Sequence, residues 1–225
     1  MKKAAFYTLG CKVNQYETEA MAELFADSGY EIKEFTEVAD VYVINTCSVT
    51  NMGDRKSRQI IRRAKKLNPN AVIAVTGCYA QTAPDEVLAI EGVNLVLGTK
   101  DRKNIVTLVE EINTESNINH VSDIMSNHEF EELQIKQYSN RTRAFIKIQE
   151  GCNQFCSYCI IPYARGPVRS RAKDDVVREI KELAHNGFKE IILVGIHVAS
   201  YGVDLGDTTL ESLIMDVDKI DGVER

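Results

Sequence analysis

The chain of 225 residues has no apolar stretch near the ~20 residues needed to cross a bilayer, and no low-complexity segment. It also has no excess of positive charge, because its formal net charge is −6 and its pI is about 5.4. These absences exclude a membrane-spanning protein and a general nucleic-acid coat, whose affinity rests on summed positive charge. The content of 44% hydrophobic and 27% charged residues is typical of a soluble globular protein.

Cysteine is scarce, with six residues, and the chain opens without a convincing export signal. The opening superficially imitates a lipoprotein signal, but its apolar segment is short and contains Tyr7 and Thr8, so we interpret it as a strand. A disulfide framework is therefore not expected. We predict a cytoplasmic protein whose thiols stay reduced and available to iron.

Three of the cysteines form the spacing Cys-x₃-Cys-x₂-Cys, at Cys152, Cys156 and Cys159, directly after the apolar segment 144–148. Three thiolates can hold three irons of a [4Fe-4S] cube and leave the fourth iron open to a substrate. Zinc usually takes four ligands, and no His or Cys follows nearby to supply the fourth. The motif therefore predicts a [4Fe-4S] cluster.

The other three cysteines, Cys11, Cys47 and Cys78, each follow a short run of apolar residues that is typical of a buried strand. A helical pattern follows each run, which indicates a parallel sheet. Because ligands bind at the carboxyl ends of such strands, the three thiols can converge on a second cluster. The alternative is that they are ordinary buried cysteines.

Strand and helix patterns alternate over residues 1–113 and predict an α/β module similar to flavodoxin, with five strands. The predicted strands are 5–10, 30–35, 41–46, 71–77 and 93–97. Asn14 is a candidate helix cap, and Glu17 would complete a capping box. Periodicity fades over residues 114–140, which we predict to be a linker.

Residues 141–225 predict a second module, with strands at 144–148 and 191–194 and helices at 176–183 and 210–220. Two strand–helix repeats cannot close a barrel and would leave a long sheet edge unpaired. We therefore expect the chain to be a piece of a longer protein.

Two basic clusters are present despite the negative net charge. One crowds a single predicted helix and consists of Arg55, Lys56, Arg58, Arg62, Arg63, Lys65 and Lys66. The other lies just beyond the second cysteine triplet and consists of Arg165, Arg169 and Arg171. Each is interpreted either as a solvated surface or as a contact for a phosphate backbone.

The residues around all six cysteines resemble the radical S-adenosylmethionine (SAM) methylthiotransferases. The matching stretches are TLGCKVN at 8–14, NTCSVT at 45–50, VTGCYAQ at 75–81, EGCNQFCSYCIIP at 150–162 and ARGPVRSR at 164–171. Lys12-Val13 most resembles the branch that acts on threonylcarbamoyladenosine (t6A), next to the anticodon of tRNA. The resemblance implies an N-terminal methylthiotransferase domain, the linker, and the first part of a radical SAM (β/α) partial barrel.

The resemblance also implies an enzyme that adds a methylthio group to C2 of t6A and uses SAM as methyl donor and radical source. A radical route suits C2, which bears only hydrogen and offers no leaving group. Cys152, Cys156 and Cys159 would hold the cluster that binds SAM. The first triplet (Cys11, Cys47 and Cys78) would hold the cluster that carries sulfur.

The implied partners are tRNA and a low-potential electron donor of the flavodoxin or ferredoxin type. Tyr158 is expected to pack on the SAM adenine, and its alternative role is core packing. His197 is left out of the site, because a lone loop histidine is more often solvated or capped. The alternative functions are methylthiotransfer to isopentenyladenosine in tRNA or to a ribosomal-protein aspartate, an iron–sulfur electron carrier, and a zinc-stabilised binding module.

Overall fold

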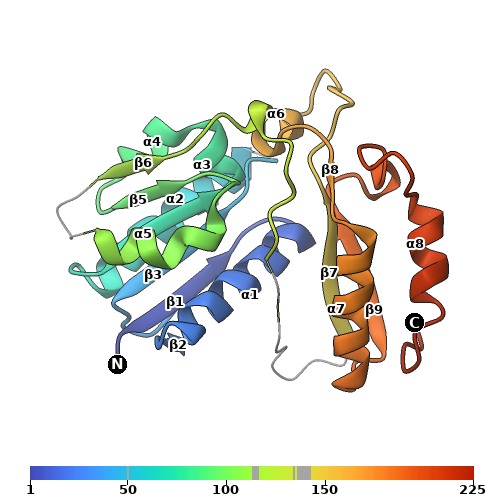
Figure 1. The fold of residues 1–225 in the computed structure, drawn as a ribbon. Helices are drawn as coiled ribbons and strands as arrows, with labels where there is room; N and C mark the ends of the chain where they lie inside the picture. The colour runs from blue at the N-terminus through green and yellow to red at the C-terminus, as the bar shows by residue number, and fades with distance from the viewer. Residues whose placement is uncertain (50, 113–116, 134, 136–142) are drawn as a thin grey trace.

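The computed structural model describes residues 1–49, 51–112, 117–133, 135 and 143–225. It contains two sheets with helix α1 (Lys12–Asp27) between them (Figure 1). The predicted boundaries at residues 113 and 140 lie outside the described residues. Within the described residues, no helix is both long and apolar enough to cross a membrane.

The first sheet has six strands in the order β2-β1-β3-β4-β5-β6, and every neighbouring pair is parallel. The strands are β1 (Lys3–Thr8), β2 (Glu31–Lys33), β3 (Val41–Thr46), β4 (Val72–Gly77), β5 (Leu95–Leu97) and β6 (Ile118–His120). Every residue of β3 is buried, as expected of a strand covered on both faces. The first five strands have the flavodoxin-like order, which confirms the predicted doubly wound module.

The sixth strand corrects the prediction of five strands, since β6 comes from the segment predicted to be a linker. Its three residues are exposed, and it joins the sheet through backbone pairing with β5 rather than through an apolar pattern. Leu133 and Ile135, further along the same segment, are buried against Tyr16 and Ala20 of α1. The described part of this segment therefore packs on the first module through Leu133 and Ile135, and on the second through the pairing of Glu132 with Arg171.

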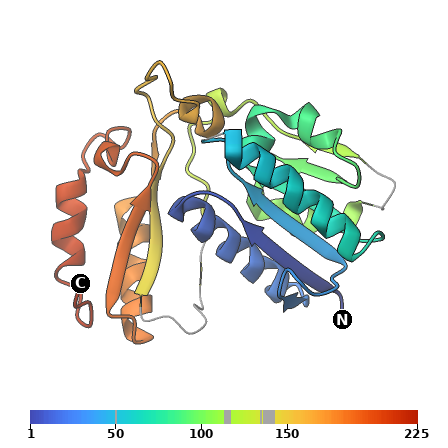
Figure 2. The same ribbon diagram turned by 180° about the vertical axis from the view of Figure 1, so that it is seen from behind.

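Helices cover both faces of the first sheet. On one face α1 and α5 (Ile105–Glu111) pack through Met21, Phe25 and Val109, after the short 3-10 turn η1 (Arg102–Asn104). On the other face Ile61 of α2 (Asn51–Leu67) and Val87 of α4 (Pro84–Leu88) join the core, beside α3 (Cys78–Thr82). Figure 2 shows α2 lying along the outside of this second face.

The second sheet has the order β8-β7-β9. Its elements are β7 (Arg143–Glu150), α6 (Ile161–Arg165), β8 (Arg169–Ser170), α7 (Lys173–His185), β9 (Glu190–Gly195) and α8 (Leu210–Val217), with 3-10 turns η2 (Ile124–Ser126) before β7 and η3 (Val198–Ser200) after β9. The predicted strands and helices are confirmed in place, with β7 parallel to β9. Helix α6 and the antiparallel strand β8 were not predicted.

Helix α1 is buried on two sides, and it begins at Lys12, before Asn14, so the predicted capping box is wrong. Its N-cap is Cys11, which makes no side-chain capping hydrogen bond. Val13 packs against Phe145 of the second sheet, and Asn14 and Glu17 lie inside the helix and are buried. Both polar side chains face the second module, where they meet partners that local sequence cannot reveal.

Candidate functional site at the strand ends

Cys11, Cys47 and Cys78 follow the carboxyl ends of β1, β3 and β4, which are neighbours in the sheet. The chain leaves β1 toward β2 on one side and then crosses to β3 on the other, so a topological switch point lies between β1 and β3. Ligands of open parallel sheets bind at such points. The structure thus places Cys11 and Cys47 on either side of a site typical of ligand binding.

The strand ends are packed closely. Gly10 has a φ of +103°, and a Cβ there would lie 3.0 Å from Cys47 Sγ, so glycine is required beside Cys11. Burial raises the pKa of the Cys78 thiol, and the neighbouring Arg165 guanidinium offsets part of this increase. Arg165 Nε donates a hydrogen bond to Cys78 Sγ over 3.3 Å.

The donor set fits a cluster better than a single ion. All six cysteines are free thiols, and no three His, Cys, Asp or Glu side chains in the described ranges could hold one metal ion. A zinc site needs sulfurs about 2.3 Å from one common centre. The thiolates of a cube bind different irons, so thiols at three separate strand ends suit the cube.

The second triplet lies on the loop between β7 and α6. Gly151 has a φ of +75°, and a Cβ there would lie 1.8 Å from the Pro167 carbonyl oxygen, so the start of the loop is held against the following segment. At its other end the Cys159 N–H donates to the Cys156 carbonyl over 2.9 Å. Cys156 is exposed, and Cys152 and Cys159 are half-buried. The loop therefore presents its thiols near the surface.

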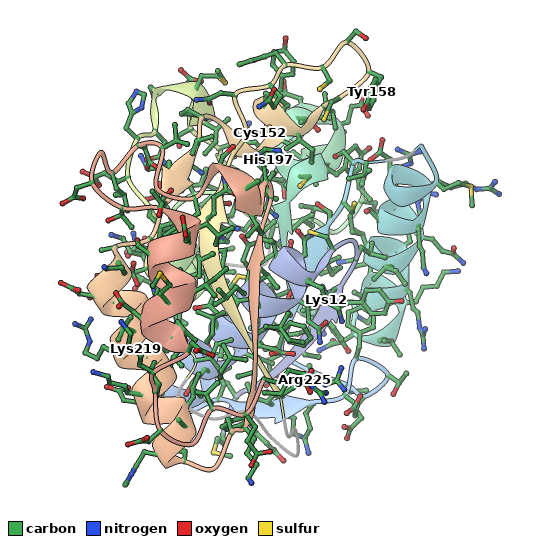
Figure 3. All side chains as sticks on the ribbon, turned by 90° about the vertical axis from the view of Figure 1, so that its right-hand side faces the viewer. Lys12, Cys152, Tyr158, His197, Lys219 and Arg225 are labelled. Carbon is green, nitrogen blue, oxygen red and sulfur yellow. The ribbon has the colours of Figure 1, made fainter. Side chains whose placement is uncertain are left out.

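Tyr158 is 90% exposed and extends outward from this loop (Figure 3). This exposure excludes the alternative of core packing, and contact with SAM stays a prediction. His197 Nδ1 lies 2.5 Å from Ser200 Oγ, and the His197 N–H donates to Gln149 Oε1 over 2.7 Å. His197 is thus hydrogen-bonded within its own loop without capping η3 through its side chain, and its exclusion from the site stays a prediction.

A buried group of ion pairs lies between the two modules, and we call it the charge cluster. Its members are Glu17, Arg102, Glu131, Lys147, Glu150, Arg165 and Arg169. Glu17 Oε1 lies 2.6 Å from Arg102 Nη1 and 2.5 Å from Arg165 Nη1. Lys147 Nζ approaches the same oxygen to 3.3 Å. One carboxylate of α1 thus faces three cations from three other elements.

Glu150, at the end of β7, is the second anion of this cluster. Its oxygens lie 2.7 Å from Arg165 Nη1, 3.1 Å from Lys147 Nζ and 3.4 Å from Arg102 Nη2. Both glutamates and these three cations are at most 1% exposed. Such burial costs several kcal/mol per ion unless the charges are well paired.

Pairing keeps both glutamates ionised. Burial alone would raise the pKa of Glu17, but Arg102, Arg165 and Lys147 together outweigh it and lower the pKa to about 2. Burial opposes ionisation at Glu150 as well, and Lys147, Arg102 and Arg165 hold its pKa well below the ordinary value. Glu17 and Glu150 therefore stay ionised at neutral pH.

Arg165 connects this cluster to the first cysteine triplet. Besides Glu17, Glu150 and Cys78, it donates from Nη2 to Asn14 Oδ1 over 2.6 Å. The interpretations of Arg165, Arg169 and Arg171 as solvated or as phosphate contacts are wrong, since these residues are 0%, 1% and 1% exposed. Carboxylates from other elements neutralise them, as Glu132 does for Arg171 at 2.8 Å.

Sequence reasoning missed Lys147 and Arg102 and misassigned Glu17. Lys147 did carry a signal, because it interrupts the apolar strand 144–148, and a lysine there must find buried anions. Arg102 has no comparable local signal, since it lies in a polar stretch. Its partners become visible only in the folded chain.

The arrangement brings the two halves of the candidate site to the same end of the molecule. Helix α3, which begins with Cys78, lies beside α6, which ends with Arg165 (Figure 1). The loop that carries the second triplet joins β7 to α6. Cys78 and the second triplet therefore flank α6.

Comparisons with known proteins match both modules. Residues 3–98 match the family described as uncharacterized protein family UPF0004, and residues 146–220 match the radical SAM superfamily. Over 100% of its length the chain is 52% identical to the threonylcarbamoyladenosine tRNA methylthiotransferase MtaB of Bacillus subtilis (strain 168), and covers 50% of that protein. The chain is thus similar to radical SAM methylthiotransferases over its whole length.

Two further relatives extend this result. The chain is 43% identical to MtaB of Aquifex aeolicus (strain VF5), over 99% of this chain and 54% of that protein. It is 37% identical to the tRNA-2-methylthio-N(6)-dimethylallyladenosine synthase of Sulfurihydrogenibium sp. (strain YO3AOP1), over 97% of this chain and 51% of that protein. The chain thus spans about half the length of the curated relatives it matches.

A solved structure shares the fold. It is the radical SAM methyltransferase TsrM of Kitasatospora setae, with a TM-score of 0.61 and 14% identity, over 96% of this chain and 51% of that one. This confirms the predicted fold class, an α/β chain with a parallel sheet followed by a radical SAM region. The two matched families imply SAM and iron–sulfur clusters as cofactors.

Proposed function

We propose that this methylthiotransferase chain is the part of a tRNA-modifying enzyme that adds a methylthio group to C2 of t6A. The observation that carries the proposal is the pairing of two cysteine triplets, one at three neighbouring strand ends and one on the loop after β7. The t6A branch is favoured by 52% and 43% identity to proteins of that name, against 37% for a dimethylallyladenosine synthase.

Each triplet would hold one [4Fe-4S] cluster. Cys152, Cys156 and Cys159 would bind the cluster that takes SAM, and the exposed Tyr158 would cover the SAM adenine. Cys11, Cys47 and Cys78 would bind the second cluster. When bound, the two groups would supply reductive cleavage of SAM and the sulfur that is transferred.

The residues of this chain position these ligands. Gly10 and Gly151 let the backbone turn tightly beside Cys11 and Cys152. Arg165 holds Cys78 through its Nε–H and is itself fixed by Glu17 and Glu150. The first triplet is thus oriented partly by charges that come from the second module. The partners would be tRNA and a low-potential electron donor of the flavodoxin or ferredoxin type, in the cytoplasm.

The decisive experiment is mass spectrometry of tRNA nucleosides from a strain that lacks the gene. We expect loss of the methylthiolated t6A nucleoside, and its return when the full-length gene is restored. Restoration with Cys47→Ala or Cys159→Ala should leave the nucleoside absent. If methylthiolated t6A persists in the deletion strain and another methylthiolated nucleoside is lost, the substrate assignment is wrong.

Anaerobic reconstitution tests the cofactors. We expect about eight irons per full-length protein, which is two four-iron clusters, and SAM cleavage after reduction. Cys159→Ala should lose reductive SAM cleavage, whereas Cys47→Ala should retain cleavage and lose sulfur transfer. One bound zinc without SAM cleavage would instead support the zinc-stabilised binding module.

A further inference from the structure

Helix α2 carries an exposed row of positive charge that the charge cluster does not use. We call this row the cationic stripe, and it consists of Arg55, Lys56, Arg62, Arg63 and Lys66, all exposed. Arg62 and Arg63 each follow Arg55 and Lys56 by seven residues, and Lys66 follows Arg62 by four, so the five side chains share one face of the helix. From Arg55 to Lys66 the stripe is about 16 Å long at the rise of an α-helix.

The stripe is unneutralised. Among the described residues, no carboxylate lies within the 4.0 Å ion-pair distance of any of its five cations. The chain as a whole carries a net charge of −6, so this positive charge is local. The stripe and the adjoining Arg58, Gln59 and Ile60 line one surface depression. A local positive face on an acidic protein steers an anionic partner to that face.

The stripe starts near the candidate site. Helix α2 begins four residues after Cys47. Arg58 Nη1 donates to Tyr79 Oη over 2.8 Å, and Tyr79 directly follows Cys78. The helix is therefore attached to the same sheet edge as the first triplet and runs away from it (Figure 2).

The chemistry of the stripe favours a phosphate backbone over a lipid surface. A helix that lies on a membrane needs an exposed apolar face. Here Ile60, Ile61 and Ala64 are buried against the sheet, and the outer face is charged. Three of the five cations are arginines, whose planar guanidinium groups bind phosphate oxygens in pairs.

We infer that the cationic stripe binds the phosphate backbone of the RNA whose base enters the strand-end site. This inference rests on the proposed function for the identity of the RNA, but the stripe itself is tested by binding alone. Each phosphate contact contributes a log–log salt slope of about 0.7 to 0.9. Relative to about 1 M salt, each contact therefore increases the affinity at about 0.15 M salt roughly fourfold to fivefold.

The test uses the full-length protein and a synthetic anticodon stem-loop RNA that contains t6A. For Arg62→Gln/Arg63→Gln we expect a Kd increased roughly fifteenfold to twenty-fivefold at about 0.15 M salt, and a salt slope reduced by about 1.5. The matched control is Arg178→Gln/Lys181→Gln on the exposed face of α7, which should keep the wild-type Kd and slope.

Two outcomes would overturn the inference. One is an unchanged Kd and salt slope in the Arg62→Gln/Arg63→Gln protein. The other is unchanged RNA binding with slower reduction by an acidic flavodoxin, which would make the stripe a surface for the electron donor. If the stripe binds RNA but the deletion strain keeps its methylthiolated t6A, the inference about the stripe is retained and t6A is rejected as the substrate.

Discussion

The charge cluster and the cationic stripe are both rich in arginine, but they lie in opposite surroundings. Arg102 and Arg165 of the cluster are fully buried and touch Glu17 and Glu150. Arg62 and Arg63 of the stripe are exposed, and no described carboxylate pairs with them. Because the first group is buried and paired with anions, its removal should lower the free energy of unfolding. Exposure without anions leaves the second group available to a partner.

The largest effect should come from removing the central anion of the charge cluster. Glu17→Gln keeps the side-chain shape but leaves Arg102, Arg165 and Lys147 with uncompensated buried charge. We expect the free energy of unfolding to fall by about 3–5 kcal/mol, measured by urea denaturation. The control Glu111→Gln, on the exposed part of α5, should change little. Equal effects of the two variants would contradict a structural role for the cluster.

Acid should weaken the same cluster. The pKa of Glu17 is lowered to about 2 in the folded state, so its stabilisation is complete above the unfolded value near 4.5. That stabilisation, on the order of 3 kcal/mol, is lost as the pH falls from about 5 toward about 2. Denaturation at a series of pH values should show that the free energy of unfolding falls less steeply with decreasing pH in Glu17→Gln than in the wild type. Parallel curves would mean that Glu17 does not titrate as the geometry requires.

A smaller effect should follow from Arg165→Lys. Lysine keeps the charge but cannot donate to Cys78, Asn14 and both glutamates at once. We expect a loss of about 1.5–3 kcal/mol in the free energy of unfolding, the usual contribution of hydrogen bonds to charged groups. The exposed Arg178→Lys is the matched comparison. If both variants have the same free energy of unfolding, the several contacts of Arg165 do not contribute to stability.

The smallest effect on stability should come from the stripe. Arg62→Gln/Arg63→Gln removes exposed charges that have no described partner, so the free energy of unfolding should change within about 0.5 kcal/mol. The same denaturation experiment measures it. A loss as large as that of Arg165→Lys would show that the stripe has a structural partner, and the contrast between the two arginine groups would fail.

Local pattern predicted the strands and the cysteine positions well because both depend on neighbouring residues. A continuous apolar run such as residues 41–44 is typical of a strand that is buried on both faces. The same reasoning placed Cys47 at a strand end. It missed β6, because Ile118–His120 has a single apolar residue, is exposed and gains its structure only by pairing with β5.

The residues of the charge cluster were hidden for a related reason. Glu17 lies three residues after Asn14, which is the spacing of a capping box, and Arg165 belongs to a basic cluster of the kind usually found at the surface. The first role requires the helix to start at Asn14, but it starts at Lys12, and the second requires solvent around Arg165. In the folded chain α1 lies between two sheets, so solvent is replaced by opposite charges from β7, η1 and α6.

The amino-acid sequence by itself determined the α/β alternation, the six thiols at defined strand ends and loop positions, and the resemblance to a methylthiotransferase. These features depend on short-range periodicity and spacing. Only the tertiary structure decided which arginines are buried and which are exposed, because a charge can be buried only where distant segments bring counter-charges to it. That packing ties Arg165 to Cys78 and leaves the outer face of α2 open.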